Sequence, residues 1–288
     1  MERHAYLIMA HGNLKLLEYL IRALDDERND IYIHIDKKVE RVPFDAFSSL
    51  CQKARLEFTP QRLNVIWGDQ TQVLNEMALY KLASKQFHQY YHLLSGVDIP
   101  LKKQDDIYSF FRDHLHKNFI YCKDAKDLSV YDYQRLSRFC FSNKVDRRIA
   151  GYLYGIQNRL GVDRFKKYHY TFTRGSNWCS LTHDAVKYLV SMEKTIVKMT
   201  RFSVCADEVY KQVLLYNSPF AETIYRNDKG ETDDLRLVDW KRRVNNSPHI
   251  FTIDDYEMII ASPKLFARKF DEKVDMEIVE KLYQRLRS

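Results

Sequence analysis

Polar side chains that could take part in chemistry gather at a few places in the sequence. His34 and Asp36 alternate with Ile33 and Ile35, so both project from one face of an expected strand. They are candidates for binding a ligand there, and a polar strand end without a ligand is the alternative. The acidic segment Cys205-Ala206-Asp207-Glu208 precedes an apolar helical pattern. Taken alone, this segment fits helix capping, because the helix dipole favours acidic side chains in a first turn.

Two basic clusters lie near the C-terminal end of the chain. One is Trp240-Lys241-Arg242-Arg243, and the other contains Lys264, Arg268 and Lys269. Such clusters could neutralise a diphosphate, since arginine binds phosphate oxygens through two parallel hydrogen bonds. Solvated basic surface is the alternative for both.

Several common motifs do not occur in the sequence. There is no P-loop, GxGxxG fingerprint, GxSxG elbow or HExxH segment, which disfavours nucleotide kinases, dinucleotide enzymes and zinc peptidases. The five cysteines are scattered and no CxxC occurs, so neither a disulfide framework nor a structural zinc site is expected. This cysteine usage indicates a reducing, cytoplasmic compartment.

The composition is that of a globular protein. The chain has 288 residues, of which 45% are hydrophobic and 30% charged, and its formal net charge is +7. Only 8 glycines and 6 prolines argue against an all-β chain with many tight turns. The positive charge is compatible with anionic substrates, an anionic membrane or nucleic acid, or with solubility alone. No apolar run approaches the roughly 18 residues of a membrane span, and the first residues do not resemble a signal peptide.

The elements that must position these residues alternate between strands and helices. In the first part, we expect strands at 4–10, 30–36, 64–67, 90–95 and 119–122, and helices at 14–24, 71–85 and 105–114. In the second, we expect helical structure within 131–167, strands at 168–173, 178–181 and 235–240, and helices at 184–194, 206–216, 253–261 and 274–287. This alternation predicts an open α/β sheet, whose ligands gather at the carboxyl ends of the strands. Those ends direct attention to His11, Asp36, Trp67 and the segment 95–98.

Taken together and in order, several segments resemble the Core-2/I-branching glycosyltransferase family. The resemblance extends from about residue 5 to 275, and 123–167 contributes no matching motif. The matching segments are Ala5-Tyr6-Leu7-Ile8 with His11, His34-Ile35-Asp36-Lys37-Lys38, Trp67-Gly68, Leu93-Leu94-Ser95-Gly96-Val97-Asp98-Ile99-Pro100-Leu101, Gly175-Ser176-Asn177-Trp178, Asp207-Glu208, Val238-Asp239-Trp240 and Leu265-Phe266-Ala267-Arg268-Lys269-Phe270-Asp271.

The resemblance implies a GT-A-type α/β fold with a mostly parallel sheet flanked by helices, here one domain over 1–288. Residues 1–122 would form the nucleotide-binding half, and 123–288 the acceptor-binding and catalytic half. The implied reaction is inverting transfer of a sugar, with N-acetylglucosamine preferred, from a UDP-sugar to a hydroxyl of a glycan. The family has no DxD metal motif, and His34-Ile35-Asp36-Lys37 agrees, so we expect no cofactor and no divalent metal.

The resemblance also assigns roles to individual residues. It implies Glu208 as the general base, and Lys269 with Arg243 or Arg242 as the cations that meet the UDP diphosphate. Asp36 is expected to contact the uridine side of the donor, in a cleft lined also by His11, Ser95, Gly96 and Asp98. Trp178 and Trp240 are expected to pack on an acceptor sugar ring, with a core position as the alternative.

The departures from the family's animal members suggest a setting. Those members carry a membrane anchor, a stem and many disulfides, which we do not find here, so a cytoplasmic protein of bacterial type is expected. Its role would be in surface polysaccharide synthesis, on an acceptor that a lipid carries, with peripheral contact to the inner face of an anionic membrane. Another donor such as UDP-xylose, a glycan-binding module without activity, and a basic nucleic-acid-binding protein are the alternatives.

Overall fold

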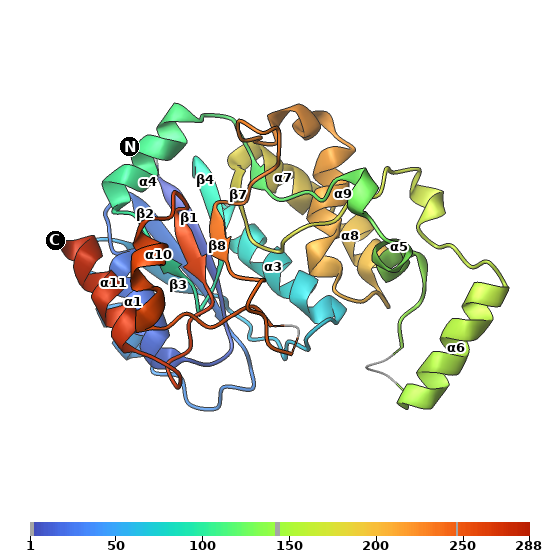
Figure 1. Cartoon of the computed structure of the whole chain (residues 1–288), viewed down its shortest axis with the longest axis horizontal. Helices are drawn as coiled ribbons and strands as arrows, with labels where there is room; N and C mark the ends of the chain where they lie inside the picture. Colours follow the sequence, from blue (N-terminus) through green and yellow to red (C-terminus); the bar gives the residue numbers. More distant parts are fainter. Residues whose placement is uncertain (1–2, 142–144, 246) are drawn as a thin grey trace.

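A six-stranded sheet forms the centre of the computed structural model, which describes residues 3–141, 145–245 and 247–288 (Figure 1). The strand order is β3-β2-β1-β4-β7-β6. The first four strands in this order are parallel, and β7 runs antiparallel to both β4 and β6. The strands are β1 (His4–Ala10), β2 (Asn29–Ile35), β3 (Arg55–Phe58), β4 (Tyr90–Ser95), β6 (Phe119–Ile120) and β7 (Cys179–Thr182). The predicted α/β class with a mostly parallel sheet is therefore confirmed.

The central strands are apolar because the sheet is covered on both faces. Tyr6 and Ile8 of β1 belong to one hydrophobic cluster, whereas Ala5 and Leu7 of the same strand belong to another. Parallel strands buried in this way appear in the sequence as nearly continuous apolar runs. For this reason the predictions for 4–10, 30–36 and 90–95 are confirmed to within a residue.

Helices cover the two faces of the sheet. Helices α1 (Leu14–Ala23), α4 (Gln104–Asp113), α10 (Tyr256–Ile260) and α11 (Glu277–Arg287) contribute to one cluster, and Figure 1 shows α1 beside α11. Helices α3 (Gln70–Ala83), α7 (His183–Ser191), α8 (Glu193–Thr200) and α9 (Tyr210–Tyr216) contribute to the other. Three further helices are α2 (Phe44–Ser49), α5 (Val130–Ser137) and α6 (Arg147–Arg159), and α6 stands away from the body in Figure 1.

A small second sheet brings the end of the chain to the loop that follows β4. Its order is β5-β9-β8, from Ile99–Pro100, Phe266–Arg268 and Arg236–Val238. Next to it, the backbone N–H of Phe270 donates to the carbonyl of Val97 at 3.1 Å. The segment 265–271 therefore lies beside the carboxyl end of β4.

Two predicted strands are wrong. Residues 64–67 form a loop, because the imidazole of His34 accepts a hydrogen bond from the N–H of Leu63 at 2.8 Å and Asp36 accepts one from Val65 at 3.2 Å. The third strand of the sheet is β3, which the sequence analysis missed. Residues 168–173 are not a strand either, because the side-chain amide of Asn217 hydrogen-bonds the backbone N–H and carbonyl of Thr171, each at 2.8 Å.

Candidate active site

The carboxyl ends of β1, β2 and β4 meet at one edge of the sheet. The register pairs Ala10 with Ile35 and Met9 with Ser95, so the residues after these strands are neighbours. Gly96 crosses directly over β1, where an added Cβ would lie 2.9 Å from the Cβ of Ala10. Glycine is thus needed for this close approach. The predicted positions His11, Asp36 and 95–98 share this edge.

The carboxylate of Asp36 organises the loop after β2. It is 2% exposed, Oδ1 accepts from the N–H of Lys38 at 2.8 Å, and Oδ2 accepts from Val65 at 3.2 Å. The ammonium group of Lys38 lies 3.5 Å from Oδ2. Asp36 therefore shapes the strand end, and its contact with uridine remains a prediction.

His11 lies in a cationic environment at the same edge. Partial burial lowers its pKa, and the nearby charge of Lys269 lowers it further, while Asp36 opposes the shift. The charges of Lys38 and Arg268 act in the same direction as Lys269. At neutral pH we therefore expect His11 to be neutral, with Lys38, Arg268 and Lys269 around it. This group of cations could bind an anionic ligand.

Asp98 and Arg268 form a buried pair beside Ser95. Asp98 is 0% exposed, and its Oδ2 accepts from the N–H of Ser95 at 2.9 Å. Its Oδ1 lies 3.6 Å from Nε of Arg268, a charge contact without a hydrogen bond. Burial raises the pKa of Asp98, and Arg268 opposes the rise. The guanidinium of Arg268 also stacks over the ring of Trp178, 4.1 Å from its centre.

The two basic clusters differ in how their charges are engaged. Arg242 forms ion pairs with Asp239 at 2.6 Å and with Asp255 at 2.7 Å. Arg243 is exposed and forms no ion pair within the described residues. Among the described residues, the hydrogen-bond partner of the Lys269 ammonium group is the hydroxyl of Ser247, at a long 3.4 Å. Lys269 and Arg243 are therefore more available to an incoming anion than Arg242.

Glu208 faces two arginines on the other side of the site. It ends the 3-10 turn η3 (Ala206–Glu208), and its Oε2 accepts from Arg135 at 2.5 Å and from Arg174 at 2.8 Å. The helix after the turn begins at Tyr210 without a side-chain cap. Glu208 therefore forms no side-chain cap on this helix, and its carboxylate is engaged by the two arginines instead.

Gly68 and Gly175, which belong to two of the segments that match the family, form backbone hydrogen bonds around Glu208. The N–H of Gly175 donates to the carbonyl of Glu208 at 2.9 Å, and Cys205 donates to the carbonyl of Gly68 at 2.9 Å. A Cβ on Gly175 would lie 1.6 Å from the carbonyl oxygen of Tyr121, so no other residue fits there.

A buried polar network stabilises the 3-10 turn η3. Lys211 and Glu76 are both 0% exposed and form an ion pair, and Lys211 also donates to Asn177 at 2.6 Å and to the carbonyl of Asp207 at 3.0 Å. Burial, with the charges of Glu76 and Glu208, raises the pKa of Asp207 to about 7. Lys211 thus ties the residue before Glu208 to the core.

Arg268 lies between the two sides of the site. Its charge interacts with Asp98 and, more weakly, with Glu208. The ring of Trp178 beneath it packs against one hydrophobic cluster, so part of its role is structural. Trp240 and Trp67 are 55% and 79% exposed, and an acceptor contact by Trp240 remains a prediction.

Sequence reasoning did not identify Arg135, Arg174 or Arg268 as site residues. Arg135 and Arg174 come from segments far from residue 208 in the chain, and no local spacing marks them. Arg268 was noted only as part of a basic cluster. The available signal for it was its place beside Lys269 within the Leu265–Asp271 segment.

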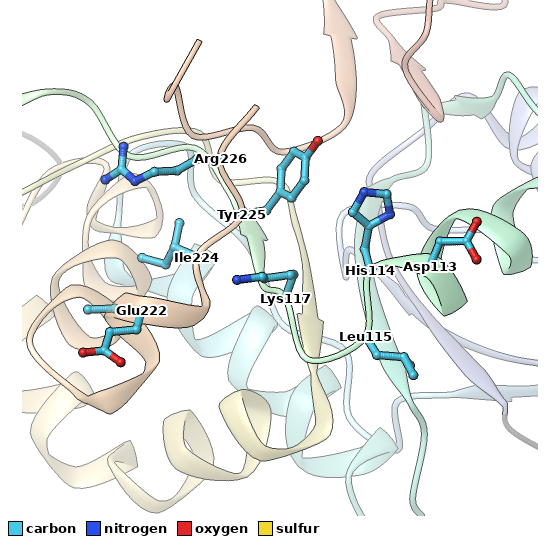
Figure 2. A pocket seen from close by; sticks show the side chains of 9 residues that line it. Asp113, His114, Leu115, Lys117, Glu222, Ile224, Tyr225 and Arg226 are labelled. Carbon is cyan, nitrogen blue, oxygen red and sulfur yellow. The ribbon is translucent and has the colours of Figure 1, made fainter. Parts of the chain in front are cut away.

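A hollow of about 430 Å³ lies away from these residues. Figure 2 shows its lining side chains, which include His114, Lys117, Tyr225 and Arg226. The carbonyl of His114 accepts a hydrogen bond from the hydroxyl of Tyr90, the first residue of β4, whereas Ser95 is the last. The hollow therefore lies at the opposite edge of the sheet.

The described residues contain neither a cluster of metal-ligating side chains nor a helix that could span a membrane. No group of three or more His, Cys, Asp or Glu side chains lies close enough together to hold a metal ion. Within the same ranges, none of the helices combines the length and the apolar character needed to cross a membrane.

Comparisons with known proteins define the class of this α/β protein. The family description "Core-2/I-Branching enzyme" matches residues 4–262. Xylosyltransferase 2 of Canis lupus familiaris is 25% identical over 301 residues, which cover 96% of this chain and 33% of the relative. Xylosyltransferase 1 of the same species is 24% identical over 310 residues, covering 97% of this chain and 30% of the relative. The chain spans about a third of the length of these relatives.

Among solved structures, mouse xyloside xylosyltransferase 1 in its apo form is similar with a TM-score of 0.41 and 9% identity. The similarity covers 93% of this chain and 97% of that one. Since the family match includes most of the sequence, the chain belongs to the Core-2/I-branching enzyme family.

Proposed function

We propose that the protein is an inverting glycosyltransferase that moves a sugar from a UDP-sugar to a hydroxyl group of a glycan acceptor. The observation that supports this most is the setting of the Glu208 carboxylate. Two guanidinium groups hold it, and its charge interacts with that of Arg268. Arg268 in turn lies at the strand ends, where α/β proteins bind their ligands. Membership of the Core-2/I-branching family supports the same reaction class.

In this proposal Glu208 is the general base. Both arginine contacts fall on Oε2, so Oε1 is the atom that can face an acceptor hydroxyl. Oε1 takes the hydroxyl proton while the acceptor oxygen attacks the anomeric carbon from the face opposite UDP. The new C–O bond forms, the bond to the diphosphate breaks, and the anomeric configuration inverts. Arg135 and Arg174 hold the carboxylate in place.

The departing UDP carries negative charge that needs stabilisation. We assign this role to Lys269 with Arg243, since Arg242 is already engaged by two aspartates. The donor side is assigned to His11, Asp36, Ser95, Gly96 and Asp98. No metal ion or other cofactor is part of the proposal.

The donor sugar has two candidates. N-acetylglucosamine is the first, from the family as a whole, and xylose is the second, because the similar proteins reported above are named xylosyltransferases. The proposed setting is surface polysaccharide synthesis in the cytoplasm, with an acceptor that a lipid carries.

A thermal-shift panel of UDP-sugars tests the proposal, because a ligand that binds only the folded state raises the melting temperature. UDP-N-acetylglucosamine and UDP-xylose are compared with other UDP-sugars and with GDP-mannose. The donor that gives the largest shift is then used for product analysis, and the anomeric configuration is read by NMR. Stabilisation by no UDP-sugar, together with salt-dependent binding of generic DNA, would favour the nucleic-acid alternative.

A further inference from the structure

Helix α6 carries an apolar stripe that the described part of the protein leaves uncovered. Ile149, Tyr152, Ile156 and Leu160 are spaced three or four residues apart and are 52%, 72%, 37% and 72% exposed. That spacing places them on one face of the helix. Figure 1 shows α6 standing away from the sheet and its covering helices. A soluble helix normally turns such a face toward a core, so this one is available to a partner.

Two arginines border the stripe. Arg148 and Arg159 are exposed, and by helical geometry both lie along the same margin of the apolar face. An apolar stripe with arginine at its edge is typical of helices that lie in a membrane interface. The stripe is about 17 Å long at 1.5 Å per residue, and the formal net charge of +7 has the sign that an anionic lipid surface attracts.

Two residues of α6 outside the apolar stripe are hydrogen-bonded to the segment that carries Arg135. The hydroxyl of Tyr154 donates to the side chain of Gln134, the residue before Arg135. The side chain of Gln157 is hydrogen-bonded to the backbone of Phe139, whose N–H donates at 2.7 Å and whose carbonyl accepts at 3.0 Å. Arg135 in turn contacts Glu208 at 2.5 Å. A surface docked on α6 is therefore connected to the proposed base through one helix.

We propose that α6 docks this protein on an anionic lipid bilayer, with its apolar stripe in the interface and Arg148 and Arg159 at the lipid phosphates. Docking at this place presents the Glu208 side of the site to acceptors carried by a lipid. That second part rests on the proposed function, whereas the membrane binding does not. Charge complementarity favours a bilayer over a second copy of the chain, because two copies would bring the bordering arginines together.

Vesicle flotation tests the binding itself. The full chain is mixed with vesicles of phosphatidylcholine alone, or with about one third phosphatidylglycerol, and we expect binding only to the second. Ile149→Ser with Ile156→Ser should weaken binding at least tenfold, since each buried CH₂ contributes about 0.8 kcal/mol. The matched control is Val274→Ser with Met258→Ser, at apolar side chains that are 53% and 43% exposed elsewhere. The control should bind like the parent protein.

A second pair of variants tests the charge. Arg148→Gln with Arg159→Gln should weaken binding by about 10- to 30-fold, because each basic residue near an anionic surface contributes about 1 kcal/mol. Lys187→Gln with Lys194→Gln removes the same charge from exposed positions on α7 and α8 and should have a smaller effect. Turnover of a water-soluble acceptor should be unchanged in the α6 variants, so a failure of docking is distinguishable from a failure of the proposed reaction.

Any of three results would overturn the proposal. One is parent protein that stays unbound to the phosphatidylglycerol vesicles at low salt. Another is a parent dimer in sedimentation velocity that the isoleucine variant converts to a monomer, which would assign the stripe to an interface between copies. Equal loss in the isoleucine variant and its control would likewise reject α6 as the docking element.

Discussion

The guanidinium group of Arg268 lies 4.1 Å from the ring centre of Trp178. Arg268 belongs to β9 in the small sheet, and Trp178 comes directly before β7 in the central sheet. The contact therefore joins the two sheets at the strand ends, where Asp98 approaches the same arginine at 3.6 Å. Because a stacked and paired arginine is held in place, its charge is preorganised between Asp98 and Glu208.

Replacing the proposed base gives the first prediction. Glu208→Gln keeps the size of the side chain and removes its ability to take a proton, so kcat should fall by ~10²–10⁴. Donor affinity, measured by calorimetry with UDP, should change little. Glu257→Gln, at an exposed position on α10, is the matched control and should keep full turnover. Near-native turnover of the Glu208 variant would remove it from the mechanism.

The second prediction separates the three cations that are candidates for binding the UDP diphosphate. Lys269→Ala and Arg243→Ala should each weaken UDP binding by about 10- to 100-fold, the value of a hydrogen bond to a charged group, and lower turnover as well. Arg242→Ala should cost less affinity, because that guanidinium is already paired with Asp239 and Asp255. Titration calorimetry with UDP measures all three. The reverse order for the two arginines would exchange their roles.

The third prediction concerns Asp36. If Asp36 contacts the donor as proposed, Asp36→Ala should weaken UDP binding more than acceptor binding, because ligands bind at the carboxyl ends of such strands. It should also lower the free energy of unfolding by about 1–3 kcal/mol, because the N–H groups of Lys38 and Val65 lose their acceptor. Asp36→Asn, which keeps one acceptor oxygen, should be milder on both counts. Unchanged UDP affinity with lowered stability would leave Asp36 a purely structural role.

The fourth prediction is that activity persists after chelation. If Lys269 and Arg243 supply the positive charge for the diphosphate, then EDTA should leave turnover nearly unchanged and added Mg²⁺ or Mn²⁺ should have little effect. The assay is initial rate with and without EDTA. Loss of activity that Mn²⁺ restores would refute the metal-independent mechanism and direct attention to Asp36 and Asp98.

The sequence predicted the parts of the fold that local patterns determine. Strands β1, β2 and β4 are buried on both faces, so their apolar runs were sufficient. The loop at 64–67 has a similar run, but its backbone is held by His34 and Asp36, which lie about 30 residues earlier in the sequence. Hydrogen bonds from a loop backbone to side chains so far away in the sequence produce no pattern of apolar and polar residues that could reveal them.

For the candidate site too, the sequence predicted only the residues that lie in short recognisable segments. Glu208, Lys269, Asp36 and the segment 95–98 came from short segments that the resemblance could match. Arg135 and Arg174 meet Glu208 only because the fold brings three distant segments together. Arg135 lies in the stretch 123–167, where no motif could be matched, so only the structure identifies it.

The last prediction concerns pH and the residue before Glu208. Burial raises the pKa of Asp207 to about 7, with the charges of Glu76 and Glu208 adding to the rise. Between pH about 4 and 7 the folded state therefore keeps a proton that the unfolded state has released. The free energy of unfolding should fall as pH increases through this window, by up to about 1.4 kcal/mol per pH unit.

Asp207→Asn isolates this contribution, because it keeps a group that can accept the hydrogen bond from Gln72 and removes the titration. We expect the variant to gain stability relative to the parent as pH increases from about 5 to 7, in denaturant melts at each pH. A parent and variant with parallel stability curves would show that Asp207 does not titrate in this range. The Lys211 contact to the Asp207 carbonyl is untouched by the substitution, so the position of Glu208 and the turnover at pH 7 should be retained.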